Sequence, residues 1–429
     1  MLKKMLYSLL FMSVSGASLG ADYLTEREFF YRCYKDLTGK RASYNHPLLL
    51  EVKNGSKKGK EACLELIQRA KFKGGAMAPE NTDNDAVLVF RNFSALHETF
   101  AANRHDETAQ QSYDPATPAT YLTHALFSSK PVSYIWQTDE ILTTVREIHK
   151  PSTNYKDEAD PKLTSGFLSD RGQLLGIDHF DLTPFTYSNK EYIPAYNFGA
   201  GFFGHSTYLH NQLRREDTAN LNGASKVPRR WGAEFYREVF CRELPVVRIE
   251  DSLSYVDTNS SVGFRNEAAC VACHVSMDRV VGVIRNQRSI ARRYLNLTSV
   301  TKPMETSWAV EADSDYMQRP PTGTLYFRSH DGELIDKKVD NLDDLGDAVA
   351  ATEDAYICLA KRYYRHFTRF DVDIGDIADP RHHGLSYDAG VHRDIVIDLG
   401  RNLKNHQSLT MLISEIMSLD SYRKPGRRP

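Results

Sequence analysis

Apolar residues recur every three or four positions along much of the chain, which is the spacing that places them on one face of an α-helix. The first such segment opens with a capping box, in which the Thr25 and Glu28 side chains each accept from the other residue's backbone N–H, and it ends at Gly39. The same periodicity predicts further helices over residues 61–70, 85–101, within 119–150, 230–244, 273–297, 354–369, 391–402 and 409–418. The sequence therefore predicts a mainly α, multi-helical protein.

Residues 320–340 carry a different pattern. Apolar and polar side chains alternate around Leu325–Arg328, and Asp331-Gly332 is typical of a tight turn between two strands. We expect a small β-hairpin here.

Two stretches divide the chain: residues 71–84 are rich in glycine, proline and asparagine, and residues 103–118 are polar and contain Pro115 and Pro118. Four parts follow from these breaks and from the change of pattern along the chain. They are an N-terminal helical domain (22–115), a helical and irregular, aromatic-rich middle region (116–225), a region that contains the hairpin (226–345) and a C-terminal helical domain (346–429).

The first 21 residues have the pattern of a secretory signal peptide. Lys3 and Lys4 precede the apolar run Met5–Val14, and small residues follow it. This run is too short to span a bilayer, and no later stretch is long and apolar enough to do so. We therefore expect a periplasmic or secreted protein without a membrane span in its mature chain.

The net charge and the predicted export of the chain bear on which partners it binds and which covalent bonds stabilise it. The net charge is −2, so the chain lacks the basic footprint of a nucleic-acid-binding protein. An exported chain can also keep disulfides.

The pentapeptide Cys270-Val271-Ala272-Cys273-His274 is the most informative motif. Two thiols three residues apart can form thioethers with the two vinyl groups of a haem, and a histidine directly after them can ligate the iron. A zinc knuckle would need a second pair of ligands at close spacing, and a redox dithiol would follow a strand in a βαβ unit. The motif therefore predicts one covalently attached haem c, bound through Cys270, Cys273 and His274, with His274 as the proximal iron ligand.

The other four cysteines are Cys33, Cys63, Cys241 and Cys358, which allow three pairings. We favour Cys33–Cys63, because both residues lie in amphipathic helices near the N-terminus, and Cys241–Cys358 follows by elimination. The alternative is that they are buried thiols.

Three stretches of the second half resemble a family of multi-domain cytochrome-c-like proteins found in planctomycetes, whose biochemical role is not established. The resemblance covers residues 226–424 and, more weakly, 24–38. It rests on Val227–Gly232 with Phe240–Pro245, on Cys270–Asp278 with Gly282, on Asp331-Gly332 with Tyr356–Ala360, and on Leu409–Tyr422. This chain has Arg279 where the family has proline. The resemblance implies an exported protein with a cytochrome-c-like haem segment in a helical setting.

The second axial ligand of such an iron decides its chemistry, because methionine raises the reduction potential, histidine lowers it and an open position admits small ligands. Met304 follows Pro303 in a loop and is the candidate distal ligand, whereas Met277 lies too close to His274 to reach the other face. Further candidates are Met317, His330, His205 and His210.

Two charged clusters have alternative interpretations. Arg285, Arg288 and Arg292 share one helix face, which suits haem propionates, an acidic redox partner or simply solvent. The aspartates between Asp371 and Asp379 suit an acidic turn better than a calcium loop, because no glutamate closes the spacing.

The sequence thus favours electron transfer to a redox partner protein through a covalent haem. Two other functions are compatible with the same motif. One is a haem enzyme of the peroxidase type, and the other is a binding or scaffold protein in which the haem is structural, which the length of 429 residues favours.

Overall fold

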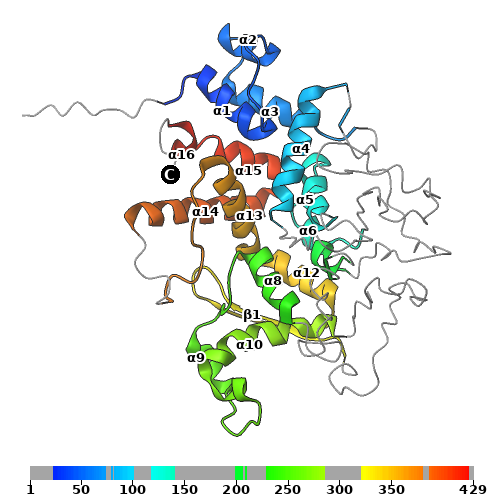
Figure 1. Ribbon diagram of the computed structural model, residues 1–429, viewed down its shortest axis with the longest axis vertical. Helices are drawn as coiled ribbons and strands as arrows, with labels where there is room; N and C mark the ends of the chain where they lie inside the picture. The colour runs from blue at the N-terminus through cyan, green and yellow to red at the C-terminus, as the bar shows by residue number, and fades with distance from the viewer. Residues whose placement is uncertain are drawn as a thin grey trace, which may run out of the picture.

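The computed structural model describes residues 23–73, 79–80, 82–100, 117–140, 199–205, 208–209, 229–285, 320–379 and 386–424. These residues form helices and one two-stranded antiparallel sheet, so the prediction of a mainly α protein with a small β element is confirmed. The described part is elongated, with α1 to α3 at one end and α9 and α10 at the other (Figure 1).

The N-terminal end is built from α1 (Glu26–Thr38), α2 (Pro47–Lys53), α3 (Gly59–Arg69) and α4 (Asn84–Glu98). The predicted capping box of Thr25 and Glu28 is present, and Gly39 ends α1 in the left-handed conformation. A disulfide between Cys33 and Cys63 joins α1 to α3, as expected. The sequence did not predict α2, whose seven residues are too short to show a clear helical period.

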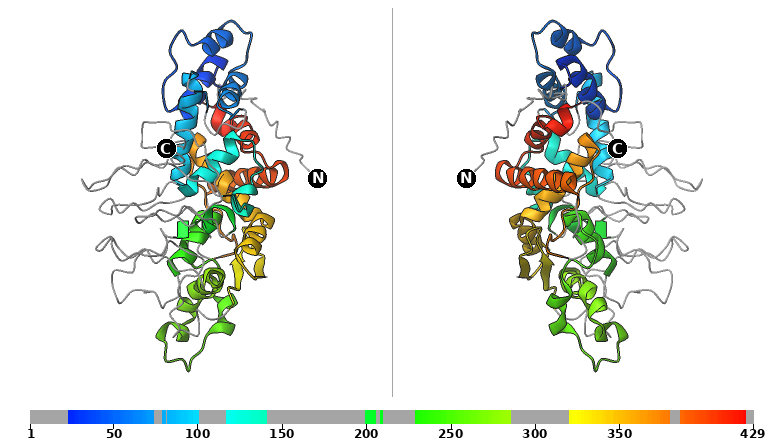
Figure 2. Two further views of the ribbon diagram at one scale, coloured as in Figure 1. Left: turned by 90° about the vertical axis from the view of Figure 1, so that its right-hand side faces the viewer. Right: turned by 90° about the vertical axis from the view of Figure 1, so that its left-hand side faces the viewer.

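The last helices return to this end of the molecule. They are α14 (Tyr387–His406), α15 (Leu409–Ile416) and α16 (Asp420–Arg423), and all views place α15 and α16 beside α1 (Figures 1 and 2). Tyr422 packs edge-on against Phe29 at 5.5 Å between ring centroids, and its hydroxyl donates to Asp36. The backbone N–H of Leu24 donates to the carbonyl of Arg423 at 2.8 Å. Both ends of the described chain therefore contribute to one core.

The centre contains α5 (Thr117–Phe127), α6 (Tyr134–Gln137), the 3₁₀ turn η1 (Gly201–Gly204), α12 (Leu342–Ala351) and α13 (Glu353–Thr368). Two helix pairs approach closely at glycines. A side chain at Gly346 of α12 would meet the carbonyl oxygen of Trp136, and one at Gly400 of α14 would meet the backbone of Ile357 in α13. One buried hydrophobic cluster runs through this centre, from Phe29 to Tyr422.

The other end contains α8 (Arg229–Phe240), α9 (Ile249–Ser252), the 3₁₀ turns η2 (Leu253–Tyr255) and η3 (Gly263–Asn266), α10 (Ala268–Val280) and the 3₁₀ turn η4 (Val281–Ile284). The predicted hairpin is formed by β1 (Gly323–Arg328) and β2 (Leu334–Val339), which pair from Gly323–Val339 to Arg328–Leu334. Its Gly332 has φ +87°, as a turn glycine can. Val271 and Val275 of α10 pack on Tyr326 of β1 in a small second cluster.

The ends of two predicted helices, 230–244 and 273–297, differ because of contacts with distant parts of the chain, and α14 extends beyond the predicted 391–402 on both sides. The helix predicted over 230–244 ends at Phe240, because Cys241 has φ +55° and is joined by a disulfide to Cys358 of α13. The helix predicted from Cys273 begins earlier, at Ala268, and gives way to η4 after Val280 instead of continuing as an α-helix. There Gly282 passes so close to the carbonyl of Thr322 that any side chain would collide with it.

Within the described residues, no helix is both long enough and apolar enough to cross a membrane. The predicted signal peptide lies outside the described residues. Both favoured disulfides are present.

Candidate functional site

The three residues of the predicted haem motif lie on one face of α10. Cys270, Cys273 and His274 are separated by three and four positions, which places them side by side along a helix. The opposite face is buried through Val271 and Val275. Cys270 is exposed, Cys273 is partly buried and the His274 side chain is 22% exposed. One side of α10 therefore packs against the protein, and the other side presents the two thiols and the imidazole.

His274 is oriented by a carboxylate one turn further along the same helix. Its Nδ1 lies 3.1 Å from Oδ2 of Asp278. An ionised carboxylate can only accept a hydrogen bond, so the proton of this contact is on Nδ1. The lone pair of the neutral ring is then on Nε2, which is the atom a metal would bind, and no contact to Nε2 is found among the described residues.

Asp278 is in turn held by Arg229, the first residue of α8. The Arg229 Nε donates to Oδ1 at 2.7 Å and its Nη2 donates to Oδ2 at 3.0 Å, a two-point pairing that fixes the plane of the carboxylate. Both side chains are 27% exposed, so solvent reaches the pair only in part.

Phe264, from η3, completes the surroundings of His274. Its ring is stacked on the imidazole at 4.0 Å between centroids with an interplanar angle of 20°. The guanidinium of Arg229 lies over the same Phe264 ring at 4.9 Å. The imidazole is therefore held by stacking on its face and by a hydrogen bond at Nδ1. Among the described residues, no contact occupies the ring edge that carries Nε2.

This arrangement fits the predicted haem. The two thiols needed for thioether bonds share a face with the imidazole, and the tautomer of the imidazole suits an axial iron ligand. Among the described residues there is no cluster of three or more His, Cys, Asp or Glu side chains that could hold a metal ion by themselves. A haem iron takes only one ligand from the motif, because the porphyrin supplies four nitrogens.

Several other predicted residues fall outside the described residues. They are the candidate distal ligand Met304, together with Met317, His210, Arg288 and Arg292. Arg285 is described, and its Nη2 donates to the carbonyl of Thr322 at 3.4 Å. Met277 is buried against Gly232 of α8.

The two described histidines among the distal candidates are placed in the interior. The Nδ1 of His330 lies 3.2 Å from Asp354 and its Nε2 lies 3.4 Å from Arg401, so both ring nitrogens already contact protein groups. His205 is fully buried and packs edge-on against Tyr121 of α5. Neither is presented to the Cys270 face of α10 by these contacts.

The described aspartates of the predicted acidic turn contact donors of the chain itself. Asp371 pairs with Lys361 and Arg365, and Asp376 pairs with Arg248. Asp373 accepts from the backbone N–H of Gly375. These carboxylates therefore serve the chain's own donors.

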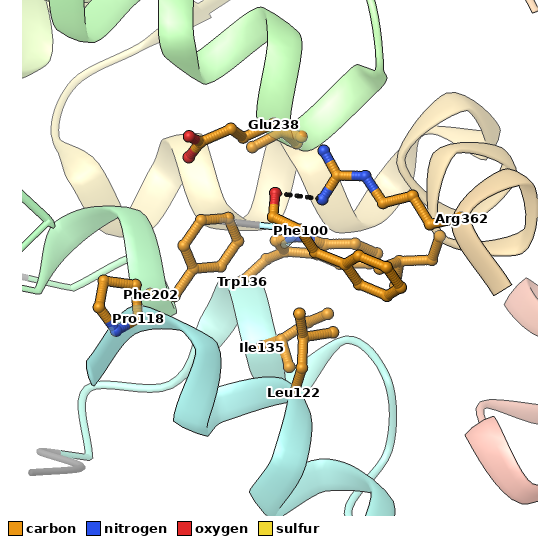
Figure 3. Close-up of a pocket in the computed structure, with 10 residues that line it drawn as sticks. Phe100, Pro118, Leu122, Ile135, Trp136, Phe202, Glu238 and Arg362 are labelled. Atoms are coloured by element: carbon orange, nitrogen blue, oxygen red, sulfur yellow. Dashed lines mark hydrogen bonds between the residues drawn. The ribbon is translucent and has the colours of Figure 1, made fainter. Parts of the chain in front are cut away.

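A separate small cavity lies between α5, α6, α8 and α13, where the side chains of Glu238 and Arg362 meet an apolar lining (Figure 3). Burial raises the pKa of Glu238 to about 8 and lowers the pKa of Arg362 to about 10. The enclosed space has room for about one water molecule, far too little for a porphyrin.

Sequence reasoning did not identify the roles of Arg229 and Phe264. Asp278 could have been found from its spacing, because a carboxylate four positions after a histidine faces it on a helix. Arg229 is 49 positions from Asp278, so no local pattern connects the two.

No protein-family model, no curated protein and no solved structure matches the chain.

Proposed function

We propose that the protein is an exported, monohaem c-type cytochrome-like electron carrier. The observation that carries this proposal is the joint placement of Cys270, Cys273 and His274 on the outer face of α10, with His274 oriented through Nδ1. In this proposal, residues 226–345 form a cytochrome-c-like haem region.

Each residue has a distinct role in the proposed site. Cys270 and Cys273 form the thioether bonds, and His274 binds the iron through Nε2. The haem supplies one-electron chemistry, whereas the chain fixes the ligand and the polarity around it. Asp278 keeps the Nδ1 proton in place and so holds the imidazole in the ligating tautomer.

Two further observations support an exported location. The Cys33–Cys63 and Cys241–Cys358 disulfides are of the kind that persists outside the cytoplasm. The same compartment is where bacteria attach haem c, and a redox partner protein would meet the carrier there. The signal-peptide pattern of the first 21 residues points to the same place.

The test is expression of the full chain in a bacterial host that carries the periplasmic machinery for haem attachment. We expect haem to stay bound on a denaturing gel and to show the α-band of a c-type haem after reduction. Cys270→Ser with Cys273→Ser should abolish the covalent haem. Glu267→Gln changes an exposed residue just before the same helix and should leave it in place. A purified wild-type chain without the c-type band would refute the proposal.

One observation favours a second candidate function, a peroxidase-like haem enzyme. A carboxylate bound to the axial imidazole makes this ligand more basic and stabilises the oxidised iron. A high-spin ferric spectrum together with turnover of peroxide would select the enzyme, and a low-spin spectrum without turnover would select the electron carrier.

A further inference from the structure

We propose that Asp278 and Arg229 set the reduction potential of the iron bound by His274, and that they act in opposite directions. Asp278 lowers the potential and Arg229 raises it. This inference rests on the proposed function and adds two positioning residues to it.

The contacts form an unbroken chain from α8 to the ligand. Arg229 donates two hydrogen bonds to Asp278, and Asp278 accepts one from Nδ1 of His274. Oδ2 takes part in both contacts, since it accepts from Arg229 Nη2 at 3.0 Å and from His274 at 3.1 Å. Any change in the charge at Arg229 is therefore felt at the atom that polarises the imidazole.

The direction in which each residue shifts the reduction potential follows from electrostatics. A carboxylate that accepts from Nδ1 pushes electron density toward Nε2, and its negative charge stabilises the more positive, oxidised iron. The guanidinium withdraws part of that density, because its two hydrogen bonds compete for the same carboxylate oxygens. The reduction potential expected for this site is therefore lower than with a neutral partner on Nδ1 and higher than with a carboxylate that has no cation beside it.

The packing of α8 against α10 keeps Arg229 beside Asp278. Arg229 lies one turn before Gly232, and a side chain at Gly232 would come within 3.0 Å of the Met277 carbonyl oxygen on α10. This close approach brings the start of α8 beside the last turns of α10. Phe264, between Arg229 and His274, adds contacts to both side chains.

The experiment is a potentiometric titration of the haem-loaded wild type, Asp278→Asn and Arg229→Gln. For Asp278→Asn we expect the equilibrium to move about tenfold toward the reduced form, which is an upward shift of about 59 mV for one electron. For Arg229→Gln we expect a downward shift. A change that only loosened the contact between α8 and α10 would move both variants in the same direction.

The double variant and a control sharpen the result. Once Asp278 is an asparagine, Arg229→Gln should have a smaller effect than it has alone. The control is Asp336→Asn in β2. Asp336 pairs with Arg279 of α10, the helix that carries His274, but does not contact His274. The reduction potential of this variant should stay at the wild-type value. Shifts of the same sign in the two single variants, or none, would overturn the inference while leaving a c-type haem in place. A chain that takes up no haem would instead refute the proposed function.

Discussion

Cys241, the residue directly after α8, is joined by a disulfide to Cys358 in the second turn of α13, with 5.3 Å between their Cα atoms. The bond links the part of the molecule that carries the predicted haem motif to the central helices. It closes a loop of 117 positions, whereas Cys33–Cys63 closes one of only 30. The two bonds therefore constrain the unfolded chain to different degrees.

We expect loss of Cys241–Cys358 to reduce the free energy of unfolding by on the order of 5 kcal/mol, and loss of Cys33–Cys63 by about 3.5 kcal/mol, because the entropy of loop closure grows with loop length. Paired serine substitutions and urea unfolding would measure both. A larger loss from the shorter loop would contradict the entropic argument.

Two glycines of α14 should respond to alanine with opposite signs. At Gly400 the new methyl carbon would lie 2.6 Å from the Cα of Ile357, so the α13–α14 contact must widen and we expect a loss of about 1–3 kcal/mol. At Gly390 there is nothing within 4 Å, so Gly390→Ala should stabilise the helix by about 0.5–1 kcal/mol. Thermal unfolding of the two variants would decide, and a stabilised Gly400→Ala would show that the helices are not in contact there.

Arg242 is the buried partner of Asp354, and it also donates to the carbonyls of Arg328 and Ile374. Removing it by Arg242→Met leaves a buried carboxylate without its cation, for which we expect a loss of roughly 3–5 kcal/mol. Arg401→Met is the matched control, because Arg401 pairs with Glu353 at the surface with 47% of its side chain exposed. This pair should contribute below about 1 kcal/mol. Equal losses in urea unfolding would contradict the role of burial.

His97 should make stability fall in acid. It is fully buried between Thr123 and Tyr363, and burial lowers its pKa from 6.5 to about 3. Below pH 6.5 His97 is protonated in the unfolded chain, whereas in the folded chain it stays neutral down to about pH 3. Stability is therefore lost as the pH falls through this window, by up to about 1.4 kcal/mol per pH unit.

The matching variant is His97→Gln, which removes the titrating group. Urea unfolding between pH 7 and pH 4 should show a pH slope that is smaller than the wild-type slope by one proton. Burial also lowers the pKa of His124 and of His366 to about 4, so the variant should keep part of the acid sensitivity. An unchanged slope would mean that His97 is protonated in the folded state.

Local signals in the sequence predicted those features that depend on neighbouring residues. The start and end of α1 follow from Thr25, Glu28 and Gly39, which act within one turn of the helix. The same holds for the hairpin turn at Gly332.

Apart from the two disulfides, features that depend on distant contacts were missed. The ends of α8 and α10 are fixed by the bond of Cys241 to Cys358 and by the approach of Gly282 to Thr322. Arg229 reaches Asp278 only because two helices cross, which no pattern along the chain encodes. The motif from Cys270 to His274 could be found from the sequence for this reason, whereas the contact of Arg229 with Asp278 could not.

The joining of the two ends of the described chain has a consequence for biosynthesis. Tyr23 donates to Asp420, 397 positions away, and Phe29 of α1 packs against Tyr422, which is synthesised long after it. Contacts of such long sequence separation form late, because the intervening chain must first be ordered. The core around Phe29 therefore cannot close until synthesis reaches α16. The stretch around Cys270 is therefore made before the core at the other end of the molecule can close.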